Sequence, residues 1–275
     1  MKYETIFVRE TVKGCPIAMH TFNPVSDSKI VELNTNIDGK SWKYLAYASN
    51  VRGSMINLYM SDTLDGEWES YSQNPILDSK DKNNFRWPST VFDNGVFHMF
   101  LDNNSDSQLE HWTSTDGIHF AFVETVYNTN PMGNYNPFIW KNPNDNNWYL
   151  YWQNTKTSTL HVTVATNIND FRNAVSSVVI TAQDALPSLP AAPSVIFKDG
   201  RYILTLEGFP GNVWHTYIFS SKSPIKGFAE MECILTQNEA CAMIYNSPDE
   251  KEVYLFVSRL SERYWIEDTH KIKII

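Results

Sequence analysis

Two acidic residues stand out because each of them ends a strongly apolar run of the sequence. Asp102 closes the run FHMFLD, and Glu207 closes the run YILTLE. A carboxyl group in apolar surroundings has a raised pKa, which suits it to acid and base chemistry near neutral pH. We therefore consider Glu207 as a general acid and Asp102 as a base or nucleophile. The alternative is structural, because acidic residues at strand ends commonly accept hydrogen bonds from the following turn.

A second set of residues could bind a sugar. Aromatic rings stack on the apolar side of a sugar ring, while amides and carboxylates bind its hydroxyl groups. The candidate substrate-binding residues are Arg86, Trp87, Tyr135, Asn136, Gln153 and His20. If Arg86 faces the pocket, its donor fork would suit an acidic sugar such as a uronate. The pair Arg86-Trp87 can equally be a cation–π contact that packs two blades, and we expect Trp152, beside Gln153, to lie in the core.

The elements that carry these residues repeat along the chain. Five aromatic-rich runs each end in a small or polar residue, and successive ends are 53, 51, 54 and 51 residues apart. The ends are Ser49, Asp102, Gln153, Glu207 and Ser258. Asn-Gly and Asp-Gly pairs, which hairpin turns favour, separate many of the flanking runs. A period of about 50 residues with several strands per unit is typical of a propeller, because one blade cannot bury both of its faces alone.

The sequence therefore predicts an all-β, five-bladed β-propeller that occupies residues 1–275 as a single domain. A strand over Glu4 to Arg9 should pair with Arg263 to Ile275 and so close the ring. The first unit is expected to begin near Gly14 to His20. An irregular stretch from Asn23 to Gly39 should follow it, and this stretch could form one wall of a pocket.

The residues that start the first strands should meet the five second-strand ends around one pocket. These starting pairs are Gly14-Cys15, Arg86-Trp87, Tyr135-Asn136, Ala191-Ala192 and Ala240-Cys241. Other titratable residues have structural interpretations. His98 is expected to be a satisfied histidine between blades, Glu110-His111 to be peripheral, and Asp116 to form an Asp-Gly turn.

Composition narrows the classes of function. The formal net charge is −9, with no cluster of Lys or Arg, which argues against nucleic-acid binding. Three cysteines without metal-ligand spacing indicate neither a zinc site nor a disulfide framework. No nucleotide-binding or metal motif is present, so we expect no cofactor and no metal. Without an apolar leader or a membrane-spanning run, the chain is expected to be cytoplasmic, or secreted if a signal was removed. The oligomeric state is left open.

The units RWPSTVFDNGVFHMF, NPFIWKNPNDNNWYLYW and APSVIFKDGRYILTLEG resemble the blades of five-bladed glycoside hydrolases. That group contains glycoside hydrolase families 43, 32, 62 and 68. The resemblance covers nearly the whole chain and implies a carbohydrate-active propeller. These families usually carry an acidic residue directly before the proline of the innermost strand. Here the residues at those places are Cys15, Trp87, Asn136 and Ala192.

Three functions follow from these observations. The first is a glycoside hydrolase-like protein that acts on an oligosaccharide or polysaccharide fragment. The second is a propeller that lost the acidic triad and binds sugars without cleaving them. The third is a protein-interaction propeller, which predicts no polar, aromatic-lined pocket. The sugar, the linkage and the stereochemistry of any cleavage are beyond the sequence.

Overall fold

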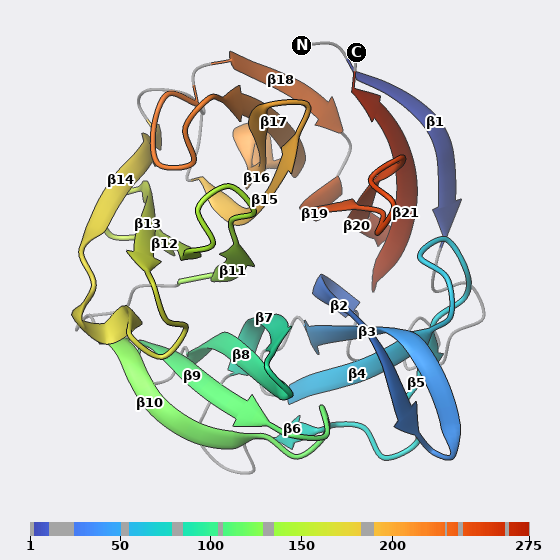
Figure 1. The fold of residues 1–275 in the computed structure, drawn as a ribbon. Coiled ribbons are helices and arrows are strands. Elements are labelled where there is room, and N and C mark those ends of the chain that lie inside the picture. The colour runs from blue at the N-terminus through green and yellow to red at the C-terminus, as the bar shows by residue number, and fades with distance from the viewer. Residues whose placement is uncertain are drawn as a thin grey trace.

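Antiparallel strands form nearly all of the regular structure in the computed structural model. The model describes residues 3–10, 25–50, 55–78, 85–103, 107–128, 135–182, 190–228, 230–235, 239–261 and 264–274. Within these ranges the strands form five sheets arranged in a ring (Figure 1). This arrangement confirms the predicted five-bladed, all-β propeller.

Each sheet is one blade, and the innermost strand of each blade comes first below. Blade I contains β2 (Val25–Ile37), β3 (Lys40–Asn50), β4 (Met55–Ser61) and β5 (Glu69–Ser70), with β6 (Leu77–Asp78) also paired to β4. Blade II contains β7 (Phe85–Asp93), β8 (Val96–Asn103), β9 (Gln108–Ser114) and β10 (Ala121–Asn128). Blade III contains β11 (Phe138–Lys141), β12 (Trp148–Asn154), β13 (Thr159–Ala165) and β14 (Ser176–Thr181), with the short 3-10 helix η1 (Phe171–Asn173) before β14.

Blade IV contains β15 (Ala191–Lys198), β16 (Arg201–Gly208), β17 (His215–Ser221) and β18 (Glu230–Leu235), with η2 (Pro210–Asn212) between β16 and β17. Blade V contains β19 (Glu239–Asn246), β20 (Val253–Ser261), β21 (Tyr264–Ile274) and β1 (Tyr3–Glu10). The N-terminal strand β1 thus pairs with β21 in register from Tyr3 opposite Ile274 to Glu10 opposite Asp268. β1 and β21 lie side by side in Figure 1, and the predicted closure of the ring is confirmed.

The start of blade I differs from the prediction. The stretch expected to be irregular, from Asn23 to Gly39, contains the 13-residue strand β2, which is the innermost strand of its blade. Its sequence VSDSKIVELNTNI is more polar than the first strands of the other blades. The segment from Gly14 to His20, predicted to begin this unit, lies outside the described residues.

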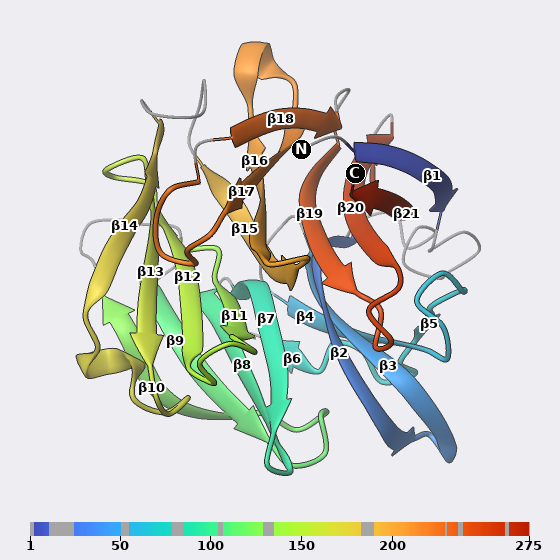
Figure 2. The ribbon, with the colours of Figure 1, turned by 45° about the horizontal axis from the view of Figure 1, so that its top comes forward.

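The hydrophobic core lies between the blades, because each sheet buries apolar side chains on both faces. Phe97, Met99 and Leu101 of β8 pack against blade I. The alternate residue Phe100 packs against Tyr135 and Ile139 at the start of blade III. Similar clusters fill the spaces between blades III and IV, IV and V, and V and I. Figure 2 shows the innermost strands converging around the axis of the ring.

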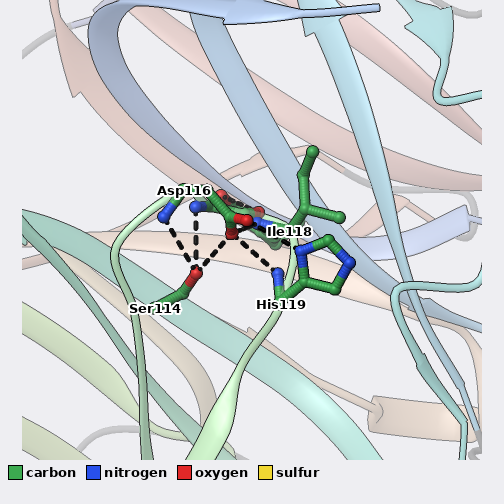
Figure 3. A network of polar contacts seen from close by, with 6 residues as sticks. Ser114, Asp116, Ile118 and His119 are labelled. Carbon is green, nitrogen blue, oxygen red and sulfur yellow. Dashed lines mark hydrogen bonds and ion pairs between the residues drawn. The ribbon is translucent and has the colours of Figure 1, made fainter.

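The Asp-Gly turn after β9 shows how the outer turns are fixed (Figure 3). The Asp116 carboxylate accepts hydrogen bonds from the backbone N–H groups of Ile118, at 2.9 Å, and His119, at 2.8 Å, and from the Ser114 hydroxyl, also at 2.8 Å. Gly117 has a φ of +77°, and a Cβ atom there would lie 2.9 Å from both Phe97 and Tyr47. Only glycine fits this turn. Asp116 is therefore a turn former, as the sequence predicted.

Candidate functional site

All five innermost strands carry the same irregularity near their first residues. In blade II, Arg86 lies opposite Asp102 and Ser89 lies opposite Phe100, so β7 holds one extra residue in this interval. The same register shift occurs in the other four blades. The bulged segments are Ser26-Asp27-Ser28, Arg86-Trp87-Pro88, Tyr135-Asn136-Pro137, Ala191-Ala192-Pro193 and Ala240-Cys241-Ala242. We call the end of the ring that carries them the bulge end.

The middle residue of the bulge has a strained backbone in three blades. The φ angles are 49° for Trp87, 39° for Asn136 and 47° for Ala192. Positive φ values are uncommon for residues other than glycine, and a bulky Trp is a marked case. Such strain and such bulges concentrate at functional sites, where they direct side chains. The bulge end is therefore the candidate functional site.

Strand pairing in blade I shows that the sequence prediction chose the wrong residues as the counterpart of Arg86-Trp87. Ser26-Asp27, and not Gly14-Cys15, occupies the position that matches Arg86-Trp87. The sequence comparison missed this position because the hairpin of blade I is longer. Ser26 precedes its partner Ser49 by 23 residues, whereas Arg86 precedes Asp102 by 16. An acidic residue, Asp27, thus stands at one bulge.

The second-strand ends lie directly opposite the first residue of each bulge. These ends are Ser49, Asp102, Gln153, Glu207 and Ser258, and each is at most 6 % exposed. Strand alternation turns each of them toward the next blade around the ring. The Ser49 hydroxyl shows this directly, because it accepts a hydrogen bond of 3.2 Å from the Trp87 backbone N–H of blade II. The structure thus brings these residues to one end, within the spaces between blades.

Asp102 is fully buried, at 0 % exposed, on the face of β8 that packs against blade III. Burial raises the pKa of its carboxyl group to about 8, although the backbone N–H of Tyr135 and the charge of Arg86 lower it. Arg86, its ladder partner, is half-buried and lies 5.6 Å from the Trp87 ring. The structure therefore shows the cation–π contact that the sequence allowed.

Blade III supplies Tyr135, Asn136 and Gln153, all of which are buried. The Tyr135 hydroxyl donates a 3.1 Å hydrogen bond to the backbone carbonyl of Ser107, and the Tyr135 carbonyl accepts one of 2.6 Å from the Gln153 N–H. Trp152 lies in the core cluster and donates its ring N–H to Thr163. The roles of Tyr135, Asn136 and Gln153 toward a ligand stay predictions, and His20 lies outside the described residues.

Glu207 is buried on the face of β16 that packs against blade V. Two residues earlier, on the same face, the Thr205 hydroxyl donates a 2.7 Å hydrogen bond to the Ala242 carbonyl of β19. Glu207 and Asp102 therefore face different spaces, with blade III between the two blades that carry them. Their predicted roles as acid and base stay predictions.

The two buried histidines of blade II contact each other. His98 Nδ1 and His111 Nε2 lie 3.0 Å apart, so His98 has a partner, as expected, and that partner lies in its own blade. His111 is completely buried, and its ring stacks on Phe100 with centroids 4.4 Å apart. Burial, with a smaller contribution from His98, lowers the pKa of His111 to about 3. The expectation that Glu110-His111 is peripheral is therefore wrong.

Blade V contains a buried group of charged residues that the sequence did not reveal. Arg259 Nε donates to Asp268 Oδ2 at 2.5 Å, and His270 Nε2 lies 3.8 Å from Glu239 Oε1. On the opposite face of the same sheet, the Ser258 hydroxyl donates a 3.0 Å hydrogen bond to Glu267. The only sequence signal is the polar run Glu267-Asp268-Thr269-His270 within a strand, because buried strands are rarely so polar.

A cavity of about 570 Å³ lies at the end of the central channel opposite the bulges. Its lining comes from later residues of the innermost strands and their turns, including Thr90, Trp140, Lys141, Lys198 and Asn246. In the described part of the chain, no group of three or more His, Cys, Asp or Glu side chains could hold a metal ion. None of the helices described there is long and apolar enough to cross a membrane.

No protein-family model matches the sequence, and no curated protein matches it. Solved structures do match the fold. A thermostable family-43 glycoside hydrolase aligns with a TM-score of 0.69 and 14% identity over 90% of this chain and 88% of that one. An exo-β-1,3-galactanase from Phanerochaete chrysosporium, solved with β-1,3-galactotriose, aligns with a TM-score of 0.69 and 13% identity over 90% of this chain and 60% of its own.

An endo-1,4-β-xylanase from Bacteroides thetaiotaomicron aligns with a TM-score of 0.65 and 16% identity over 91% of this chain and 90% of that one. The chain spans only about 60% of some of these neighbours, including the galactanase and another glycoside hydrolase. At such identities the likeness shows the fold. The chain therefore has the five-bladed propeller fold found in family-43 glycoside hydrolases, as its sequence pattern suggested.

Proposed function

We propose that this protein is a carbohydrate-active propeller, a glycoside hydrolase-like protein that acts on an oligosaccharide at the bulge end. The observation that carries the proposal is the bulge repeated in all five blades, with Trp87, Asn136 and Ala192 held in left-handed conformations. A fold does not fix a function, so the argument rests on what gathers at this end. Carboxyl groups, amides and aromatic rings from successive blades lie at this end, and groups of these kinds suit sugar recognition.

The solved neighbours supply a first choice of substrate. Two of them are exo-β-1,3-galactanases, and two others are β-1,3-galactosidases of family 43. A β-1,3-linked galacto-oligosaccharide is therefore the first ligand to test, followed by xylan fragments. Glycoside hydrolysis generally uses two carboxyl groups that flank the bond. Glu207 is the carboxyl group that we assign to this task at the bulge end of blade IV.

A second function is favoured by a specific observation. Asp102, the second carboxyl group predicted from the sequence, is 0 % exposed, and blade IV has alanines at both Ala191 and Ala192. A propeller that binds sugars without cleaving them would need neither an exposed Asp102 nor an acidic residue at that bulge. The two functions differ only in catalysis, so one set of variants separates them.

The experiment measures release of reducing sugar from β-1,3-galacto-oligosaccharides, xylo-oligosaccharides and aryl glycosides. Wild type, Glu207→Gln and Asp102→Asn are compared, with Asp116→Asn as a control for an exposed turn carboxyl group. We expect cleavage by wild type and by the control, and a loss of about 10²-fold or more in Glu207→Gln. Sugar binding by calorimetry without any cleavage would establish the binding function instead. Neither cleavage nor binding across the panel would refute both.

A further inference from the structure

Glu239 is a carboxyl residue at the bulge end that the sequence did not single out. It is the first residue of β19 and directly precedes the bulge Ala240-Cys241-Ala242. Its side chain is 19 % exposed, in contrast to the completely buried Asp102. The Glu239 carboxyl group is therefore the more accessible of these two to a ligand.

The cluster that Glu239 forms with Arg259, Asp268 and His270 contains two carboxyl groups and one guanidinium group. Arg259, its partner across the ladder, donates to Asp268, and His270 lies 3.8 Å from the Glu239 carboxyl group. Asp268 and His270 are almost fully buried, and Asp268 Oδ1 and His270 Nδ1 have no hydrogen-bond partner among the described residues. With both carboxyl groups ionised and His270 neutral, this cluster would carry one net negative charge in a buried place. Such a charge favours uptake of one proton.

The direction of the pKa shifts agrees with this arrangement. Burial, followed by the charge of Asp268, raises the pKa of Glu239, and Arg259 only partly opposes this effect. Burial also lowers the pKa of His270, and Arg259 adds to that effect while Asp268 opposes it. Both directions favour a proton on Glu239 over a proton on His270.

Glu207 of blade IV faces the interface between blades IV and V, as Glu239 of blade V does. Its side chain lies on the face of β16 that packs against blade V, where Thr205 donates to Ala242. One strand farther out, the Thr216 hydroxyl donates a 3.2 Å hydrogen bond to the Glu239 backbone carbonyl. Glu207 and Glu239 are thus brought to the same interface at the bulge end. Asp102 faces blade III and is not part of that interface.

We propose that Glu239 is the proton donor in glycoside hydrolysis and that Glu207 is the carboxylate that works with it. This inference rests on the proposed function. Glu239 gives its proton to the glycosidic oxygen as the bond from that oxygen to the anomeric carbon breaks. A water molecule bonds to the anomeric carbon and loses a proton to Glu207. Exchange with solvent then removes the proton from Glu207 and returns one to Glu239.

The test compares two substrates that differ in their need for a proton donor. On an oligosaccharide, Glu239→Gln should lower kcat/KM by about 10²- to 10⁴-fold, the range typical of a lost general acid. On a 2,4-dinitrophenyl glycoside, whose leaving group departs without a proton, the loss should be less than about 10-fold. Glu207→Gln should lower the rate on both substrates, because Glu207 acts on the water.

Two controls guard against a purely structural effect. Glu252→Gln changes an exposed carboxyl group of the same blade and should leave both rates unchanged. Asp268→Asn should keep activity but move the alkaline limb of the pH profile to lower pH, because it removes the negative charge that helps Glu239 hold its proton. If Glu239→Gln does not fold, Glu239→Asp should retain the alkaline limb at a reduced rate.

The outcomes separate the two proposals. A wild type that cleaves the oligosaccharide with Glu239→Gln equally active overturns the assignment of Glu239 and leaves the proposed function intact. An equal loss on both substrates also overturns it, since a proton donor is dispensable for the activated glycoside. A wild type that cleaves nothing refutes the proposed function and this inference together.

Discussion

Blades II and V both bury carboxyl groups between strands, but their neighbours differ. In blade II, Asp102 lies fully buried, and burial raises its pKa to about 8, so that it keeps a proton at neutral pH. In blade V, the equally buried Asp268 receives a 2.5 Å hydrogen bond from Arg259. One blade neutralises its carboxyl group with a proton, and the other does so with a guanidinium group.

This difference shows that equivalent places in a repeated fold can serve different purposes. A protonated carboxyl group needs little from a nearby arginine, whereas a carboxyl group buried in an ion pair depends on its partner. Blade V also extends its charged group to the partly exposed Glu239. The charged group of blade V is therefore better suited to proton transfer, whereas the buried Asp102 of blade II is better suited to a structural role.

The sharpest way to break this comparison is to remove each arginine. Arg259→Met should lower the free energy of unfolding by about 2 kcal/mol at pH 7, because it removes the partner of the buried Asp268, while the 33 % exposure of Arg259 keeps the cost below that of a fully buried pair. Arg86→Met should cost less than about 1 kcal/mol at the same pH, because Asp102 is already neutral. Chemical denaturation of both variants measures the two values. Equal losses would contradict the different roles of the two arginines.

Asp102→Asn tests the proton in blade II. The folded pKa of about 8 lies above the ordinary value of 3.8, so the folded state holds a proton that the unfolded state has lost between these pH values. Stability from this group is complete below about pH 4 and is lost as the pH rises toward 8, by about 1.4 kcal/mol per pH unit. Wild type should therefore lose about 2 kcal/mol between pH 6 and pH 8. Asp102→Asn should lose much less, and Asp116→Asn should behave as wild type.

His111→Gln tests a buried group of blade II whose pKa is lowered, whereas that of Asp102 is raised. The folded pKa of about 3 lies below the ordinary 6.5, so the unfolded state binds the extra proton on acidification. Stability from this group is complete above about pH 6.5 and falls as the pH drops toward 3. Wild type should lose about 1.5 kcal/mol from this group between pH 6.5 and pH 5. Thermal unfolding at the two pH values should show a smaller loss in His111→Gln than in wild type.

Asp116→Ala measures the small effect expected for an exposed carboxyl group. Partial burial of Asp116 raises its pKa, but hydrogen bonds from His119, Ile118 and Ser114 outweigh this and hold the pKa below its usual value. Loss of these bonds at the surface should lower the free energy of unfolding by about 1 kcal/mol. Glycan cleavage should not change. A loss as large as that in Arg259→Met would show that burial does not distinguish these carboxyl groups.

The sequence predicted the fold well because repetition is visible without knowing any contact. The regular spacing of the second strands predicted the five blades, and the strand pattern of Glu4 to Arg9 predicted the closure by β1 and β21. The first strand of blade I was missed because β2 is polar along much of its length and its hairpin is longer than the others. Spacing alone cannot locate a strand whose hairpin departs from the repeat.

The candidate site was harder to predict because it depends on register. The prolines after Trp87, Asn136 and Ala192 marked the right places in three blades. The bulges themselves cannot be read from residue types, and Asp27 was not recognised as the equivalent residue in blade I. In blade V, Glu239, Arg259 and His270 come together across three strands. These contacts depend on how the strands pair, and the sequence alone does not specify that pairing.

The central claim is that a sugar binds at the bulge end, and a structure with a bound ligand tests it most directly. Crystals of Glu207→Gln grown with a β-1,3-galacto-oligosaccharide would keep the ligand uncleaved. We predict density for the sugar beside Trp87 and Asn136, with Glu239 within hydrogen-bonding distance of a glycosidic oxygen. Density only in the cavity lined by Trp140 and Lys198 at the opposite end, or only on the outer strands, would contradict the account.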